Sequence, residues 1–253
     1  MKAIILAAGR GSRMGPITED IPKCLIPLQG KTLLEWQLEA LTNAGIKEIG
    51  IVTGYLAEKI KVQKIKYFVN KRWSKTSMVA SLLCADEWLQ SDTCVVSYSD
   101  IVYPTLTVFS LSKTEGDLVI SYNTDWLALW KARFGDPLVD SETFKVNDKG
   151  ILLEIGNKAK SIKEIQGQYM GLLKFTPKGW EEFKRYLSTL LPEEQDKFDM
   201  TKVLQRLIKE GFVINTVPIK GDWYEIDNEK DIELGGSHCN FLRDLNLQTY
   251  GKC

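Results

Sequence analysis

Residues 2–14 read Lys-Ala-Ile-Ile-Leu-Ala-Ala-Gly-Arg-Gly-Ser-Arg-Met, and Pro22-Lys23-Cys24-Leu25 follows shortly after them. The unbroken apolar run from Ala3 to Ala7 predicts a short strand that is buried on both faces, as in the centre of a parallel sheet. The strand leads directly into a loop that contains Gly9 and Gly11. Both glycines permit positive φ and close backbone approach, so several N–H groups of the loop can face one anion.

Two basic residues, Arg13 and Lys23, add positive charge beside this loop. Arginine presents a planar fork and lysine a point charge, and together with the loop amides they suit a triphosphate. A glycine pair that only bends the chain is the simplest alternative. The loop is not a dinucleotide fingerprint, because that pattern requires a glycine where Met14 stands. It is not a P-loop either, since no Gly-Lys-Ser/Thr follows.

The longer phrase from Leu6 to Met14, with Pro22-Lys23 after it, resembles the signature of nucleotidyltransferases that join an NTP to a phosphorylated small molecule. This resemblance implies an α/β fold of the Rossmann-like, GT-A-like kind. Such a fold has a mixed, mostly parallel sheet flanked by helices and a small β-rich acceptor-binding subdomain. The resemblance covers most of the chain, from Met1 to about Asp231.

The composition excludes several classes of function. The chain has 253 residues, and its 33 Lys and Arg residues balance 33 Asp and Glu residues, so no overall basic field exists to hold nucleic acid. No apolar run approaches the roughly 20 residues of a membrane span. The start of the sequence lacks the pattern of a signal peptide. Five scattered cysteines without a CxxC motif indicate reduced thiols, and we expect a cytoplasmic protein.

The single histidine, His238, argues against histidine-based acid–base chemistry and against histidine-rich zinc sites. Any metal ion should therefore be held by oxygen ligands, which are the ligands that Mg²⁺ prefers.

Strands and helices alternate through the first half of the sequence. Thr32 and Glu35 form a capping box before a helix that Gly45 closes. Strands are expected at 49–53 and 65–69, with a helical stretch at 57–61 between them. This alternation is typical of a parallel sheet with helices on its faces.

Two further segments of the first half are expected to carry functional residues. The polar, basic loop 70–77 precedes an apolar helix over 78–89, and Thr76 or Ser77 would cap that helix. A buried strand over 94–100 ends on Asp100. Ligands of α/β sheets lie at the carboxyl ends of strands, so Asp100 should face the same crevice as the glycine loop. A simple turn-forming role for this aspartate is the alternative.

The second half reads differently and is the natural acceptor-binding part. After a strand over 117–122, tryptophans and basic residues cluster between positions 126 and 133. A β-hairpin over 143–155 and a strand over 168–175 follow. Two tryptophans with an arginine and a lysine could hold an ammonium group and a phosphate. The same tryptophans could equally be core residues.

The C-terminal part contains helices that begin after Thr176 and Asp199, a strand over 213–217, and the stretch Trp223-Tyr-Glu-Ile-Asp227. In an extended strand Glu225 and Asp227 share one face, about 7 Å apart. Two carboxylates placed in this way are costly unless they are exposed or bridged by a cation. We expect a single domain over 1–235, with a nucleotide half over about 1–122 and an acceptor half over about 123–235. Residues 236–253 would form a tail or linker.

The resemblance also implies which residues do what. Lys23, Arg13 and Asp100 would be catalytic, and Asp100 and Asp227 would bind Mg²⁺ or Mn²⁺. The residues implied to bind the nucleotide come from the first loop and the strand ends, and they are Leu6, Ala8, Gly9, Arg10, Gly11, Ser12, Arg13, Lys23, Thr76, Ser77 and Ser99. The residues assigned to the acceptor are Trp126, Trp130, Arg133, Lys160, Gln168 and Glu225.

Three regions of resemblance point to different acceptors. The start is similar to sugar-1-phosphate nucleotidylyltransferases, and Trp223 to Asn228 resembles bacterial choline-phosphate cytidylyltransferases. The stretch from Lys158 to Gly171 resembles relatives that activate 2-aminoethylphosphonate with CTP. We therefore expect CMP transfer from CTP to 2-aminoethylphosphonate with release of pyrophosphate, for phosphonate decoration of lipids or glycans. The alternatives are phosphocholine and sugar phosphates as acceptors. Fusion to, or association with, another enzyme of the same pathway is compatible with this function.

Overall fold

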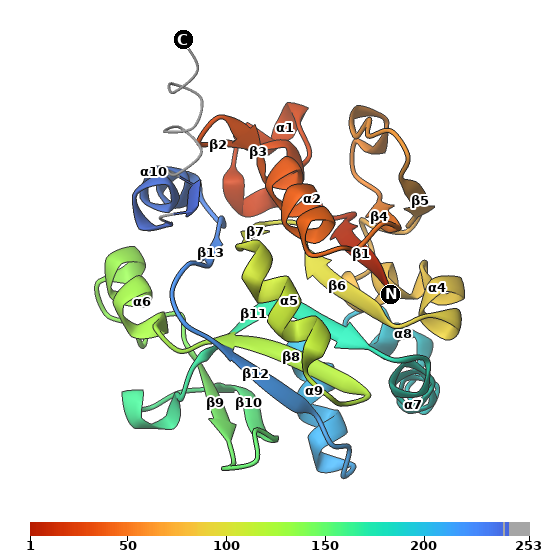
Figure 1. The fold of residues 1–253 in the computed structure, drawn as a ribbon, viewed down its shortest axis with the longest axis vertical. Helices are drawn as coiled ribbons and strands as arrows, with labels where there is room; N and C mark the ends of the chain where they lie inside the picture. The colour runs from red at the N-terminus through yellow and green to blue at the C-terminus, as the bar shows by residue number, and fades with distance from the viewer. Residues whose placement is uncertain (240, 243–253) are drawn as a thin grey trace.

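The strand predicted at the start of the chain is an interior strand of a seven-stranded sheet (Figure 1). The computed structural model of the chain describes residues 1–239 and 241–242. The strands of the sheet, in spatial order, are β12 (Asn215–Ile219), β8 (Leu118–Asn123), β11 (Gln168–Phe175), β6 (Cys94–Tyr98), β1 (Lys2–Ala7), β4 (Ile49–Thr53) and β5 (Lys66–Val69).

The sheet is mixed and mostly parallel, as the sequence predicts. Strand β1 runs parallel to β4 and β6, β4 runs parallel to β5, and β12 runs parallel to β8. Strand β11 is antiparallel to both of its neighbours, β6 and β8. The ends of β1 and β6 therefore meet at one edge, where the glycine loop and Asp100 follow their strands.

Strand β1 is buried on both faces because its side chains alternate between two apolar cores. Ala3 and Ile5 contribute to the core that includes residues of α2 (Leu33–Asn43) and α5 (Thr105–Lys113), the two helices in front of the sheet in Figure 1. Ile4 and Leu6 contribute to the opposite core. The helices that complete this second core are α3 (Met78–Leu83), α7 (Pro177–Leu187) and α9 (Met200–Lys209).

Three of the four predicted helix caps are confirmed; the exception is α3, which begins after Ser77 without a side-chain cap hydrogen bond. Thr32 accepts a hydrogen bond from the Glu35 amide while Glu35 accepts one from the Thr32 amide. Gly45, with φ of 90°, follows the end of α2. Thr176 and Asp199 cap α7 and α9 in the same way, each accepting a hydrogen bond from a backbone amide of the first turn.

Several boundaries differ from the sequence-based expectation; among them, β6 ends at Tyr98, two residues before Asp100. The helix expected over 78–89 is broken after Leu83, and α4 (Asp86–Ser91) packs against α7, where Asp86 accepts a hydrogen bond from the Trp180 indole. The helical stretch expected at 57–61 is a 3₁₀ turn over Ala57–Lys59. Strand β12 begins at Asn215 rather than at 213, because its register is set by parallel pairing with β8.

Short elements complete the fold around the sheet edge. The predicted hairpin is present as β9 (Glu142–Val146) and β10 (Leu152–Lys158). A second short pairing joins β7 (Ile101–Val102) to β13 (Tyr224–Glu225). The other elements are η1 (Ser12–Met14), α1 (Ile17–Asp20), η2 (Lys23–Leu25), β2 (Pro27–Leu28), β3 (Lys31–Thr32), α6 (Trp126–Phe134), η4 (Ile162–Glu164), α8 (Pro192–Gln195) and α10 (Glu229–His238).

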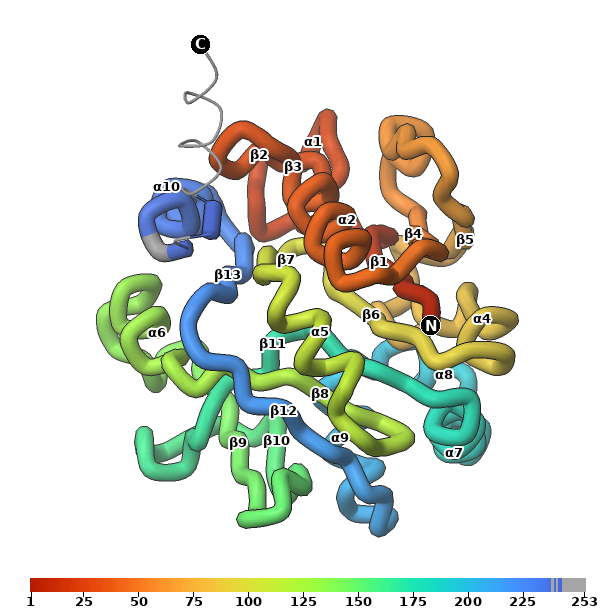
Figure 2. Tube along the Cα trace, viewed as in Figure 1, coloured from red at the N-terminus to blue at the C-terminus, as the bar shows by residue number. Residues whose placement is uncertain are grey.

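The boundary expected after residue 235 falls inside helix α10, which Asn228 caps and which packs against α6 and β2 (Figure 2). Cys239 and Leu242 are buried in the first core, so the packed chain extends beyond the predicted domain end. The remainder of the predicted tail, residues 240 and 243–253, lies outside the described residues. Among the described helices, none combines the length and apolar character needed to cross a bilayer.

Candidate active site

Lys23 lies at the centre of the edge where β1 and β6 end. It opens η2, directly after the extended Pro22, and its side chain is only 7% exposed. Its Nζ atom donates to Asp100 Oδ2 at 2.6 Å and to Asp227 Oδ1 at 2.9 Å. Burial lowers the pKa of Lys23, but the two carboxylates outweigh that effect and the net shift is upward. Lys23 is therefore held as a fixed positive charge.

Gly11 allows Lys23 to pack in this position. Its φ of 68° lies in the left-handed region, and a Cβ atom at Gly11 would lie 2.9 Å from Lys23 Cδ. Gly9 differs, because its φ is not positive and a Cβ atom there would meet no atom within 4 Å. Of the two glycines singled out in the sequence, only Gly11 uses the conformational freedom of glycine.

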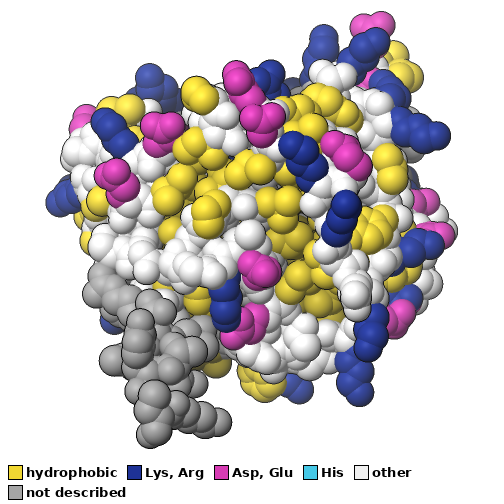
Figure 3. Space-filling view, turned by 90° about the horizontal axis from the view of Figure 1, so that it is seen from above, with side chains coloured by type: hydrophobic (Ala, Val, Ile, Leu, Met, Phe, Trp, Pro, Cys, Tyr) yellow, Lys and Arg dark blue, Asp and Glu magenta, His cyan; other side chains and the backbone are white. Residues whose placement is uncertain are grey.

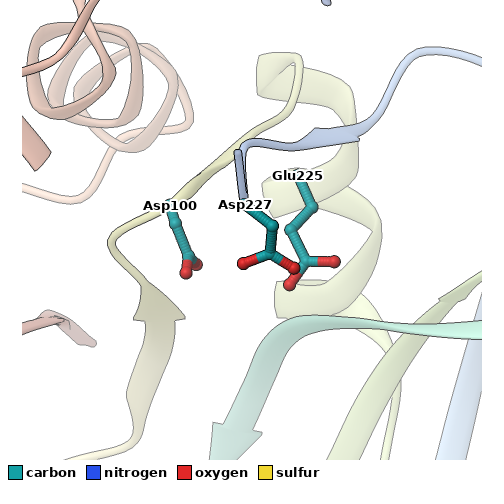
Figure 4. A group of neighbouring side chains, drawn as sticks. All are labelled: Asp100, Glu225 and Asp227. Atoms are coloured by element: carbon teal, nitrogen blue, oxygen red, sulfur yellow. The ribbon is translucent and has the colours of Figure 1, made fainter. Parts of the chain in front are cut away.

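Three carboxylates converge beside Lys23 (Figure 4). Antiparallel pairing of β7 with β13, extended by the hydrogen bond from the Ile226 amide to the Asp100 carbonyl, brings Asp100 next to the later segment. Ligand oxygens of Asp100, Glu225 and Asp227 all lie within 4.8 Å of one another. Burial, together with the charges of Asp227 and Asp100, raises the pKa of Glu225 to about 8. The cluster thus holds more negative charge than its surroundings neutralise.

These carboxylates fit a hard divalent cation. They supply only oxygen donors, which suits Mg²⁺ or Mn²⁺. Asp100 Oδ1 is buried and has no hydrogen-bond partner, so one lone-pair-bearing atom of the cluster is available for a cation. Asp100 and Asp227 are the two residues that the sequence predicts for the metal, and the structure places Glu225 with them.

A cleft beside Lys23 contains most of the residues predicted to bind the nucleotide. Arg10 and Ser12 are exposed on the loop and do not line it. Sequence reasoning did not assign Trp73 or Ser81, although Trp73 lies within the polar loop that it singled out. The lining comprises Leu6, Ala8, Gly9, Gly11, Arg13, Lys23, Trp73, Thr76, Ser77, Met78, Ser81, Tyr98, Ser99 and Asp100.

The wall of this cleft that contains Thr76, Ser77 and Ser81 is fixed by hydrogen bonds from both halves of the chain. Asn70 Nδ2 donates to the hydroxyls of Thr76 and Ser81, each at 3.0 Å. The Ser77 amide donates to the carbonyl of Asp196 at 2.7 Å, and the Ser77 hydroxyl donates to the carbonyl of Phe198. A segment from the second half therefore fixes the loop on the nucleotide side.

A second pocket adjoins the first and shares Arg13 and Tyr98 with it. Three residues assigned to the acceptor, Trp130, Gln168 and Glu225, line this second pocket. Polar groups that the sequence did not assign to the acceptor also line this pocket, among them those of Ser141, Glu142, Lys158, Tyr169 and Thr201. They come from a loop, two hairpin strands, β11 and α9, so no local pattern in the sequence marks them.

The two tryptophans do not form an ammonium-binding cage. Trp126 is 3% exposed, belongs to the first core and lines neither pocket. Trp130 is equally buried, stacks on Trp223 with ring centroids 6.0 Å apart, and donates its indole N–H to the carbonyl of Asp140. The alternative stated for them, that large aromatic residues fill the core, describes their placement.

Arg133 and Lys160 also lie away from the positions expected of acceptor ligands. The Arg133 side chain is 1% exposed and forms a bidentate pair with Asp231, at 2.9 and 3.0 Å. Lys160 is exposed outside the pocket lining, whereas Lys158, two residues earlier, lines the pocket.

Buried polar atoms without hydrogen-bond partners gather at this site. Within the described part of the chain they are Asp100 Oδ1, Arg133 Nη1, Ser141 Oγ and Tyr169 Oη. Asp100 lines the nucleotide cleft, Ser141 and Tyr169 line the second pocket, and Arg133 lies behind Glu225. Unsatisfied buried polar groups are rare in native proteins, so their concentration here marks a binding site.

The face of the molecule drawn in Figure 3 carries basic and acidic side chains interspersed, with hydrophobic atoms between them. This distribution matches the balanced composition and shows no single-sign field on that face.

Comparison with known proteins places the chain in a family. The family described as the MobA-like NTP transferase domain matches residues 3–138. The chain is 38% identical to the CTP:phosphoglutamine cytidylyltransferase of Campylobacter jejuni over 250 residues, covering 92% of this chain and 98% of the relative. It is 33% identical to the choline-phosphate cytidylyltransferase of Streptococcus pneumoniae over 156 residues, covering 58% of this chain and 67% of the relative.

The fold has a close structural counterpart. The inositol-1-phosphate CTP transferase from T. maritima superposes with a TM-score of 0.72 at 19% identity, covering 92% of this chain and 94% of that one. Residues 3–138, which match the family, include the glycine loop, Lys23 and Asp100, and these line the cleft described above. The chain therefore belongs to the MobA-like NTP transferase family, a nucleotidyltransferase family with CTP-using members.

Proposed function

We propose that this protein transfers CMP from CTP to a small phosphonate or phosphate acceptor that carries a primary ammonium group, with release of pyrophosphate. The observation that carries the proposal is the junction of two pockets at Arg13 and Tyr98, beside the fixed cation Lys23 and a cluster of three carboxylates. The relatives named as cytidylyltransferases support CTP as the nucleotide.

The reaction requires charge neutralisation more than proton transfer. An acceptor oxygen attacks the α-phosphorus, the bond to the β-phosphate oxygen breaks, and pyrophosphate leaves with the bonding electrons. The acceptor is already ionised near neutral pH, so no protein base is needed, which agrees with the near-absence of histidine. Lys23 would stabilise charge that builds on the α-phosphate, and Arg13 with the loop amides would hold the β- and γ-phosphates.

In this structure Lys23 and Arg13 are engaged with carboxylates. Arg13 contacts both oxygens of Asp227, at 2.9 and 3.1 Å, although its side chain is largely exposed. These ion pairs neutralise part of the charge of Asp100 and Asp227 before substrates bind. Asp100 and Asp227, with Glu225 beside them, would hold Mg²⁺ or Mn²⁺. The ion, when bound, would neutralise phosphate charge and orient the reacting groups.

The second pocket favours an acceptor that donates hydrogen bonds. The carboxylates of Asp140 and Glu142 line it and have no ion-pair partner among the described residues. Loss of solvation at the pocket wall, together with the charges of nearby carboxylates, raises the pKa of Asp140 and of Glu142. A primary ammonium donates three hydrogen bonds and suits such acceptors, whereas a quaternary ammonium prefers aromatic faces. Trp126 lies outside the pocket, so the two tryptophans cannot form a cage there, and this contrast supports 2-aminoethylphosphonate over phosphocholine.

A second acceptor is favoured by a specific observation. Lys158 lines the same pocket without an ion-pair partner in the described part of the chain, so the pocket offers a cation as well as carboxylates. An amino-acid headgroup presents an ammonium and a carboxylate together. The Campylobacter jejuni relative is named for phosphoglutamine, and a phosphorylated amino acid would use Lys158 where 2-aminoethylphosphonate would not.

Pyrophosphate release separates these acceptors. We expect 2-aminoethylphosphonate with CTP to give a kcat/KM at least about tenfold above phosphocholine, which corresponds to ~1.4 kcal/mol of transition-state binding. Phosphoglutamine and glucose 1-phosphate complete the panel, and excess EDTA should abolish turnover. Equal or reversed preference for phosphocholine would remove the primary-ammonium acceptor but leave CMP transfer intact. Full turnover in EDTA would remove the metal assignment.

A further inference from the structure

Arg133 is the most completely buried charged group beside the carboxylate cluster. It lies near the end of α6, and its side chain is 1% exposed. Its guanidinium is enclosed by the rings of Trp130, Phe134 and Tyr224, at 4.9–5.8 Å from their centroids. A group enclosed in this way cannot reach a phosphonate in the pocket, so the acceptor role predicted from the sequence does not account for it.

The partner of Arg133 is Asp231, a residue of α10 that lines neither pocket. Arg133 Nε and Nη2 donate to the two oxygens of Asp231 at 2.9 and 3.0 Å. A buried bidentate pair of this kind has both geometric specificity and strength. Its position is therefore fixed more firmly than that of an exposed ion pair.

This pair fixes the backbone that carries Asp227. Asp231 Oδ2 also accepts hydrogen bonds from the amides of Asp227 and Asn228, at 2.9 and 3.1 Å. On the other side, Arg133 lies 3.5 Å from Glu225 Oε2 and 3.8 Å from Asp227 Oδ2. One guanidinium thus lies within 4 Å of carboxylate oxygens of Glu225, Asp227 and Asp231.

We infer that Arg133, through Asp231, is a positioning residue that holds the Glu225 and Asp227 carboxylates in the arrangement needed to bind a divalent cation. This inference rests on the proposed function, because it requires that the cluster binds such a cation. Residues that orient metal ligands from behind commonly change metal affinity by about 10–100-fold when they are replaced.

The charge of Arg133 should weaken the binding of a divalent cation, whereas its hydrogen-bonding geometry should strengthen it. These opposite effects make the inference testable. A positive charge beside a cation site weakens cation binding by repulsion, so removal of charge alone would tighten binding. Arg133→Lys keeps the charge and loses the bidentate fork, whereas Arg133→Met loses both. Positioning predicts weaker cation binding in both variants. A pure charge effect predicts no change in the first and tighter binding in the second.

The experiment titrates Mn²⁺ into wild type, Arg133→Lys, Arg133→Met and Asp231→Asn, with free Mn²⁺ measured by electron paramagnetic resonance. We expect the Mn²⁺ dissociation constant to rise on the order of tenfold in all three variants. Arg185→Lys is the matched control, because Arg185 is exposed on α7 away from the site. In steady-state assays the kcat of the three variants should fall while the acceptor KM stays within about twofold of wild type.

Unchanged Mn²⁺ affinity in Arg133→Lys and Asp231→Asn would overturn the inference, as would tighter binding in Arg133→Met. A raised acceptor KM with normal Mn²⁺ affinity would restore the role of Arg133 as an acceptor ligand. Asp231→Asn keeps the test valid if an arginine variant does not fold. A wild-type protein that transfers CMP but binds no Mn²⁺ would overturn this inference alone. A wild-type protein that transfers no CMP would overturn the proposed function.

Discussion

The two pockets that adjoin beside Lys23 are built in different ways. The nucleotide cleft is lined by three stretches of the first half of the chain, within residues 6–23, 73–81 and 98–100. The acceptor pocket draws its lining from more widely separated parts of the chain, which are the first loop, the end of β6, α6, the loop before β9, both hairpin strands, β11, α9 and the β13 segment. The residues of the first pocket therefore lie closer together in the sequence than those of the second.

This difference explains how the two sites respond to change. A cleft of backbone amides and a fixed lysine can serve any nucleoside triphosphate, and its residues are constrained by their neighbours in sequence. A pocket of separate side chains can change its acceptor by substitution at one position. Enzymes on one fold commonly change function in this way, by altering the site while keeping the scaffold.

The largest effect is expected at Lys23, which lines the nucleotide cleft and donates a hydrogen bond to Asp227 of the acceptor pocket. Lys23→Ala should lower kcat by a factor on the order of 10²–10³, because it removes a preorganised charge that stabilises the transition state. Arg10→Ala is the control, since Arg10 is exposed and does not line the cleft. A Lys23→Ala enzyme with near-normal kcat and only a raised KM for CTP would show that Lys23 merely binds substrate.

A change in the acceptor pocket should leave the nucleotide cleft untouched. Glu142→Gln removes a carboxylate charge, and we expect kcat/KM for 2-aminoethylphosphonate to fall about tenfold while KM for CTP stays within about twofold. Lys160→Gln is the control from the same half of the chain, because Lys160 lies outside the lining. Equal losses for CTP and acceptor would contradict the separation of the two pockets.

Between the pockets, Glu225 should make the stability of the metal-free protein depend on pH. Its pKa is about 8 in the folded protein against an ordinary 4.5, so unfolding releases a proton between these values. Wild type should therefore lose stability as pH rises from 4.5 to 8. Glu225→Gln has no carboxyl group that titrates at this position. Its melting temperature in EDTA should therefore exceed that of wild type at pH 8.5 and match it near pH 4. An identical pH profile for both proteins would refute the raised pKa.

The smallest effect compares the two glycines of the first loop. Gly11→Ala forces a side chain into the left-handed region and against Lys23, and we expect a loss of about 1–3 kcal/mol of unfolding free energy. Gly9→Ala should be nearly neutral for stability, because its Cβ would meet no protein atom within 4 Å. Chemical denaturation measures both, and a comparable loss at Gly9 would contradict the assignment of strain to Gly11 alone.

The contrast between local and long-range contacts also determines how much could be predicted from the sequence. The double-sided burial of β1 and the cap of α2 follow from local patterns, and the structure bears them out. Glu225 and Asp227 do lie close together, but β13 ends at Glu225, so they do not share the face of a continuous strand. The roles of Trp126 and Arg133 do not follow, because burial depends on which helix covers them. Arg133 meets Asp231 across 98 positions of sequence, a pairing that no local period encodes.

Helix α10 gives a second example from the end of the chain. Its segment lacks a clear apolar period, which led to the expectation of a tail from residue 236. Its place is instead set by the Asn228 cap and by contacts of Asp231 with Arg133 and the Asp227 amide. Polar contacts of this kind leave no hydrophobic pattern in the sequence.

The central claim is that the two pockets join CMP to an amino-bearing phosphonate or phosphate, and ³¹P nuclear magnetic resonance tests it directly. Incubation of the protein with CTP, Mg²⁺ and 2-aminoethylphosphonate should yield pyrophosphate and a product with two coupled phosphorus signals, one phosphonate and one phosphate. Phosphoglutamine in place of the phosphonate would give the corresponding coupled pair if it is the acceptor. Unchanged CTP with both acceptors, or pyrophosphate with CMP and no coupled product, would contradict the claim.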